Sequence, residues 1–300
     1  MWLYLGILSA VFLGLYDISK KHALQANAVL PVLFLATVFG ALTITPAAVL
    51  SQIVPAAMKQ AGLYVPAVGL RAHLHLFAKA MIVSSSWVLA YFAIKHLPIS
   101  IVSLIRASEP IWSLFGAITL FHERLTMIQW AAIAIIVISY YGFSVAGSRE
   151  GIVFHRNKWV LFMFLSGLIG AGSSLYDKFL IQTLGYEPVL VQVWFSIYLV
   201  VVLGMVLVVF WLPKYRKYTK FAWRWSIVSI GVMLIIADFV YFHALKEPGA
   251  LIALLSAIRR CSVIVSFAAG AVIFGDVNIP RKAAALAGVL LGIFLILFSR

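Results

Sequence analysis

The chain has 300 residues, of which 64% are hydrophobic and only 11% are charged, with a mean hydropathy of +1.07. Soluble proteins carry about a quarter of their residues as charged side chains, so this composition excludes an ordinary soluble domain. The net charge of +14 comes largely from short basic loops such as residues 213–224. Such loops are typical of membrane topology and contact with anionic lipids, which argues against nucleic-acid binding.

Ten continuously apolar stretches follow one another along the chain, and each is close to the 20 residues or so that a helix needs to cross a bilayer. The stretches do not alternate between apolar and polar residues, which favours helices over a β-barrel. No basic segment precedes the first stretch, so we expect it to be retained as a span. The predicted spans are 2–22, 31–50, 73–94, 99–121, 127–146, 158–182, 188–211, 224–245, 249–274 and 282–299. The sequence thus predicts an all-α, multi-pass integral membrane protein. We expect it to lie in a bacterial inner membrane.

An internal duplication organises these spans. Residues 91–126 and 241–279 are imperfect copies of one pattern, and Leu15-Tyr16-Asp17 reappears as Leu175-Tyr176-Asp177. Each offset is about half the chain length, as in transporters that place the solute between two repeats. Because each half has five spans, a tandem copy must insert with the opposite orientation. We therefore expect two inverted five-helix repeats, 1–147 and 158–300, joined by a loop at 148–157.

One segment of the first copy resembles a known family. The motif elements Ala93-Ile-Lys-His-Leu-Pro98, Glu109-Pro110 and Phe121-His-Glu123-Arg124-Leu125-Thr126 resemble the EamA domain of the drug/metabolite transporter superfamily. His122 replaces the usual glycine, and the second copy has Cys261 at the proline position and Asp276-Val277-Asn278 for Glu-Arg-Leu. The resemblance implies ten helices in inverted halves, a central cavity and transport of a small polar solute.

The sequence does not decide the orientation of the chain in the membrane, because two arguments disagree. The loops after odd-numbered spans carry most of the Lys and Arg residues near span ends, which predicts that these loops are cytoplasmic and both termini external. The resemblance to the family implies the reverse.

Ionisable side chains are unusually frequent inside the predicted spans. One such residue at mid-bilayer costs about 2.5–3.5 kcal/mol on insertion scales, so it usually faces protein or a water-filled cavity. A polar path through the protein is therefore predicted. The residues concerned are Asp17, Lys79, Arg106, Glu109, Asp177, Lys178, Asp238, Arg259 and Arg260.

The deepest of these residues are arginines. Arg259 and Arg260 lie about ten residues from either end of the ninth span. Their planar guanidinium groups suit a carboxylate or a phosphate on a solute. The alternative is that they form buried ion pairs with Asp238 or Asp177.

Arg106 lies at a comparable depth in the first copy, which would line the solute site with positive charge from both halves. Glu109 is three residues further along the same helix, so the two side chains can instead neutralise each other. The sequence leaves both possibilities open.

Four carboxylates are candidates for ion coupling or gating, because burial favours the protonated form of such a group. The alternative for Asp17 is an ion pair with Lys20 or Lys21 on its own helix. Glu123 is expected to cap the helix that follows it, with gating as the alternative. The coupling candidates are Asp17, Glu109, Asp177 and Asp238.

Aromatic residues at helical spacing are candidates for stacking on the solute, with packing or lipid contact as the alternative. These are Trp87, Tyr91, Trp194 and Tyr241.

No nucleotide-binding or nucleophile motif is present in the sequence. The prediction is a secondary transporter, without cofactor or metal and not an enzyme, that moves a small polar solute with an acidic group by alternating access. Its expected partners are the solute and membrane lipids, and the chain is expected to be a monomer or homodimer. The alternative is an integral-membrane enzyme that acts on a lipid-linked phosphate through the arginines.

Overall fold

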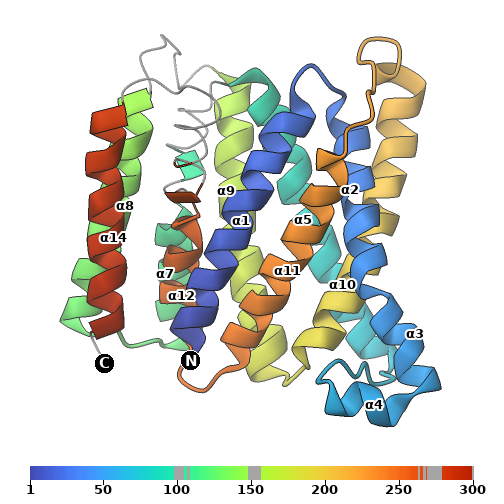
Figure 1. Cartoon of the computed structure of the whole chain (residues 1–300), viewed down its shortest axis with the longest axis horizontal. Helices are drawn as coiled ribbons and strands as arrows, with labels where there is room; N and C mark the ends of the chain where they lie inside the picture. Colours follow the sequence, from blue (N-terminus) through green and yellow to red (C-terminus); the bar gives the residue numbers. More distant parts are fainter. Residues whose placement is uncertain are drawn as a thin grey trace.

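The computed structural model describes residues 1–97, 105–106, 109–147, 157–262, 264–265, 268 and 279–298. Throughout these residues the regular secondary structure is helical (Figure 1). The first half contributes α1 (Trp2–Leu24), α2 (Val29–Ile44), α3 (Pro46–Ile53), α4 (Pro55–Gln60), α5 (Leu70–His96), α7 (Glu109–Phe121) and α8 (Met127–Gly147). The second half contributes α9 (Lys158–Lys178), α10 (Pro188–Val206), α11 (Ser226–Lys246), α12 (Ile252–Arg260) and α14 (Ile279–Phe298). Two π-helical segments, η2 (Phe179–Thr183) and η3 (Leu207–Tyr215), continue α9 and α10.

Six helical segments among the described residues are long and apolar enough to cross a membrane. Each begins within a few residues of the start of one of the predicted spans. The six segments are Trp2–Leu24, Val29–Ile53, Leu70–Ile94, Lys158–Thr183, Pro188–Pro213 and Ser226–Lys246. Shorter apolar helices within α7, α8 and α14 coincide with three further predicted spans. Parts of the predicted spans 99–121 and 249–274 lie outside the described residues. The chain is therefore a multi-pass membrane protein whose described residues form only helices and the connections between them.

The second predicted span differs in detail from the structure. Helix α2 ends at Ile44, and α3 begins at Pro46, because proline lacks the N–H that would continue the hydrogen-bond ladder. A short extra helix, α4, begins at Pro55 and was not predicted. Both α3 and α4 lie at the end of the molecule where α1 begins and α14 ends, which we call the termini end (Figure 1).

The helices pack in matched pairs across the two halves. Helix α1 packs on α11, and α5 packs on α9. If α1 corresponds to α9 and α5 to α11, these two contacts are equivalent. The same correspondence relates α2 on α11 to α10 on α5, and α7 on α9 to α12 on α1. Helices α8 and α14 pack on each other at one side (Figure 1).

Small residues permit the closest of these contacts. A Cβ atom added at Gly231 of α11 would lie 2.3 Å from the carbonyl oxygen of Ala36 and 2.6 Å from the amide nitrogen of Gly40, both in α2. The two backbones therefore touch directly, as is common where small residues line helix contacts in membranes.

Candidate functional site

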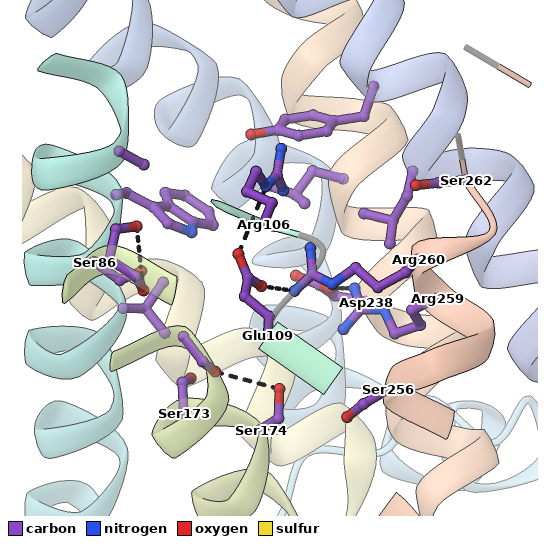
Figure 2. Close-up of a pocket in the computed structure, with 18 of the residues that line it drawn as sticks. Ser86, Arg106, Glu109, Ser173, Ser174, Asp238, Ser256, Arg259, Arg260 and Ser262 are labelled. Carbon is purple, nitrogen blue, oxygen red and sulfur yellow. Dashed lines mark hydrogen bonds and ion pairs between the residues drawn. The ribbon is translucent and has the colours of Figure 1, made fainter. Parts of the chain in front are cut away.

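A cavity of about 190 Å³ lies between the two halves, where α1, α5 and α7 face α9, α11 and α12, with one residue from α10 (Figure 2). Nine of the eleven residues predicted to bind solute or couple ions line this cavity. They are Asp17, Trp87, Tyr91, Arg106, Glu109, Asp177, Asp238, Arg259 and Arg260. The structure thus brings together side chains that are up to 243 residues apart in the sequence, as between Asp17 and Arg260.

The lining of the cavity carries an excess of positive charge. Among the described residues, five cationic side chains and four carboxylates line it, which leaves one positive charge in excess. The cations are Lys20, Lys79, Arg106, Arg259 and Arg260, and the carboxylates are Asp17, Glu109, Asp177 and Asp238. In a low-dielectric site an unbalanced charge is costly, so the cavity favours an anion.

Glu109 is shared between two arginines (Figure 2). Its Oε2 atom accepts a hydrogen bond from Arg260, and its Oε1 atom lies 3.6 Å from Nε of Arg106. The glutamate packs against α9, where a Cβ atom at Gly167 would lie 3.1 Å from its Cγ atom. Only 8% of the Glu109 side chain is exposed, whereas 28% of Arg106 and 27% of Arg260 are. The two arginine side chains are therefore more accessible than the carboxylate that they share.

Arg259 is held on two sides. Its Nη2 atom lies 2.6 Å from Oδ1 of Asp238, and its guanidinium carbon lies 4.1 Å above the ring of Tyr241. Tyr241 is thus buried beneath Arg259 and is not one of the cavity-lining residues. Trp194 also lies outside the lining, since its ring packs edge-on against His73 at 4.5 Å. Among the predicted stacking residues, the structure places Trp87 and Tyr91 in the lining.

A buried ion pair joins the halves between α5 and α9. Lys79 donates a hydrogen bond to Asp177, and its ammonium group lies 4.4 Å from the ring of Phe195 and 5.2 Å from that of Phe242. Both charged side chains are almost fully buried, with 3% and 7% of their areas exposed. The pair therefore forms a buried contact between the halves.

The equivalent aspartate of the first half has a more open setting. Asp17 is 27% exposed and accepts a hydrogen bond of 2.7 Å from Lys20 on its own helix, as the sequence suggested. The hydroxyl groups of Tyr16 and Tyr91 lie 3.2 Å apart beside this pair, and Lys20 lies 4.3 Å from the Tyr16 ring.

Serine hydroxyl groups form much of the remaining polar lining, and the sequence reasoning missed them. Ser86 of α5 donates to the carbonyl oxygen of Ser166 of α9 at 2.9 Å (Figure 2). The signal was available, because serines cluster at 84–86 and 173–174 within otherwise apolar helices. The lining serines are Ser86, Ser113, Ser166, Ser173, Ser174, Ser256 and Ser262.

Glu123 caps a helix other than the one expected. Its Oε1 atom accepts from the amide of Ile252 at 2.9 Å and its Oε2 atom from Ala253 at 3.3 Å, so it caps α12 in the opposite half and not α8. Lys178 of α9 completes the cluster at 2.5 Å. The expectation of a cap on the following helix was wrong because sequence proximity cannot reveal which helix N-terminus lies closest in space.

The comparisons with known proteins agree with this architecture. No curated protein matches the sequence. Among solved structures 28 chains match, and one crystal structure superposes with a TM-score of 0.75 over 100% of this chain and 99% of the other. Their sequences are 14% identical, so the likeness concerns the fold alone. Residues 1–145 match the family model described as the EamA-like transporter family. The resemblance seen in the sequence is confirmed by this match, which is consistent with an EamA-domain protein of the drug/metabolite transporter superfamily.

Proposed function

We propose that the chain is a secondary transporter that binds a small solute bearing a carboxylate or phosphate in the central cavity. In this proposal the two halves are inverted five-helix repeats, and their rocking opens the site to each side of the membrane in turn. The observation that carries the proposal is the single positive charge in excess over the carboxylates among the described lining residues. An anionic group on the solute supplies the missing negative charge.

The proposed two-repeat architecture is supported by the packing pattern. Every matched helix contact, such as α1 on α11 with α5 on α9, joins one helix from each half. An alternating-access carrier needs two such bodies with a site between them. The two aspartates of the Leu-Tyr-Asp segments add support, because Asp17 of α1 and Asp177 of α9 both line the cavity.

The binding step follows from the sharing of Glu109. A carboxylate or phosphate that enters the cavity competes with Glu109 for Arg106 or Arg260, and the glutamate keeps the other arginine. A forked, charge-assisted hydrogen bond forms, which is stronger than a neutral one. The seven lining serines offer further hydroxyl donors and acceptors to the polar remainder of the solute.

The proposal is tested by a thermal-unfolding screen of the detergent-purified protein against carboxylates, phosphates, neutral polar solutes and organic cations. A ligand at about 100 times its dissociation constant stabilises the native state by about 2.7 kcal/mol, which is readily measured. We expect stabilisation by members of the anionic group only. Solutes that stabilise the protein are then followed by uptake of the radiolabelled compound into proteoliposomes.

Stabilisation by cations or neutral solutes, with none by any anion, would contradict the proposed charge selectivity. Anion binding without uptake in either direction across the vesicle membrane would instead contradict transport. In that case a receptor or enzymatic role for the cavity would have to be examined.

A further inference from the structure

A basic and aromatic loop lies at the end of the molecule opposite the termini end, on the side of α10 and α2 (Figure 1). This loop, residues 216–225, connects η3 to α11 and lies at the same end as the α1–α2 turn (Figure 1). It contains four basic residues, Arg216, Lys217, Lys220 and Arg224. No acidic residue occurs in the sequence between Glu187 and Asp238. The loop therefore has a strong positive charge that its own segment of sequence does not balance.

The loop is fixed in place by hydrogen bonds. Buried Asn27, in the α1–α2 turn, accepts from the amide of Ala222 at 2.9 Å and donates to its carbonyl oxygen at 2.7 Å. Arg224 donates to the carbonyl oxygen of His22. Trp211 donates to the hydroxyl of Thr219 at 3.1 Å. The other three basic side chains, Arg216, Lys217 and Lys220, are exposed on a preorganised backbone, which reduces the entropy that binding a ligand would cost.

Exposed aromatic rings identify where the loop lies relative to a bilayer. Tyr218 is 81% exposed and Trp225 is 79% exposed. Trp223 packs edge-on between Trp225, with ring centroids 5.9 Å apart, and Phe39 of α2, at 5.7 Å. Tyrosine and tryptophan concentrate at the depth of the lipid headgroups, where one end of the ring is apolar and the other hydrated. The loop is therefore placed at the membrane surface and not far out in water.

We propose that the 216–225 loop is a binding site for the headgroup of an anionic phospholipid in the adjacent leaflet. The phosphodiester accepts charge-assisted hydrogen bonds from Arg216 and Lys220, and the aromatic rings contact the glycerol and upper acyl chains. Juxtamembrane basic residues attract anionic lipids in this way, and arginine can bind a phosphate through two hydrogen bonds at once. This site is separate from the central cavity and does not depend on the proposed transport function.

The test compares two double variants that each remove one arginine and one lysine. R216Q/K220Q alters the loop, whereas K59Q/R71Q alters exposed residues on the other half of the chain, in α4 and α5 near the termini end. The proteins are purified in a neutral detergent and titrated with phosphatidylglycerol or phosphatidylcholine, and native mass spectrometry counts the bound lipid. We expect R216Q/K220Q to weaken phosphatidylglycerol binding about tenfold or more, and K59Q/R71Q to leave it within about twofold.

Two controls make the result decisive. The thermal unfolding midpoint of each variant in detergent must match that of the unchanged protein, which shows that the fold is intact. Inorganic phosphate is added as a competitor, because a site for the lipid headgroup and its chains resists free phosphate at concentrations that displace a simple anion. Equal binding of phosphatidylglycerol by both double variants, or complete displacement of the lipid by millimolar phosphate, would overturn the proposal.

Discussion

Two glutamates of the first half contact opposite ends of the same second-half helix, and their surroundings differ. Glu123 meets the N-terminus of α12, where two backbone amides and Lys178 bind its carboxylate. Glu109 meets the C-terminal end of α12, where Arg260 and the first-half Arg106 share it. The Lys178 side chain is 10% exposed, but the two arginine side chains are more than a quarter exposed.

The difference distinguishes a structural contact from a binding site. At Glu123 one carboxylate meets one cation and two amide donors, and the negative charge also suits the positive end of the α12 dipole. At Glu109 two cations meet one carboxylate beside an open cavity. A balanced cluster that is closed to the cavity holds the halves together, whereas a cluster with surplus cations beside a cavity can accept an anion.

The largest expected effect tests the structural contact. Glu123→Ala leaves the buried ammonium of Lys178 and two amides of α12 without their partner. Breaking a buried ion pair by removing one member costs about 3–5 kcal/mol, because the remaining charge is left uncompensated. We expect a correspondingly large fall in the free energy of unfolding, measured by denaturant titration in detergent.

The matched control is Glu187→Gln, which breaks the exposed ion pair with Lys246. About half of each of these side chains is exposed, so solvent screening limits the loss to about 0–1 kcal/mol. If the two variants lost equal stability, the Glu123 cluster would not be a structural contact of the kind described.

The second effect, of intermediate size, tests the binding site. Arg260→Lys keeps the positive charge but removes the planar fork that would hold a carboxylate or phosphate. We expect binding of the stabilising anion to weaken about 10- to 100-fold, measured by isothermal titration, with little change in stability. Arg71→Lys is the control, because Arg71 is exposed in α5 and does not line the cavity.

Unchanged anion affinity in Arg260→Lys, and likewise in Arg106→Lys and Arg259→Lys, would contradict the assignment of the surplus cations to the solute. The comparison between the two glutamates would then have no functional meaning.

The sequence pointed to many of the residues that line the cavity, because charged residues inside membrane spans are rare enough to notice. It also offered, as alternatives, two pairs that are close in the sequence and are present in the structure, Arg106 with Glu109 and Asp17 with Lys20. Pairs between helices were predicted only in part. The pair of Arg259 with Asp238, which the sequence analysis named as an alternative, is present in the structure. The partner of Arg260 was not predicted. Arg260 reaches Glu109 across 151 residues. The partner of a buried charge is set by helix rotation and tilt, which a single sequence does not specify.

The same limit applies to the fold. Long apolar stretches predicted the helix positions to within a few residues. The break between α2 and α3 at Pro46 could not be predicted, because proline also occurs within helices that cross membranes. Tyr241 and Trp194 could not be told from Tyr91 and Trp87 by spacing. Their rings lie outside the cavity because of how α10 and α11 are rotated, while the other two rings line it.

The smallest expected effect separates the aspartates of the two Leu-Tyr-Asp segments, and it extends the comparison from the glutamates to ion coupling. Asp17 lines the cavity and its side chain is 27% exposed, whereas Asp177 is 7% exposed and bound to Lys79, whose ammonium group lies near two aromatic rings. Only the more open group can exchange a proton with water in the cavity without breaking a contact between the halves.

A gradient of one pH unit corresponds to about 1.4 kcal/mol, so coupling to one proton changes solute accumulation by up to about tenfold. We expect Asp17→Asn to abolish this response in proteoliposomes, with transport still measurable without a gradient. Asp177→Asn should instead lower stability, because Lys79 loses its partner, and the folded fraction should keep the response. A gradient response that survives in Asp17→Asn would show that this residue is a structural ion pair like Asp177.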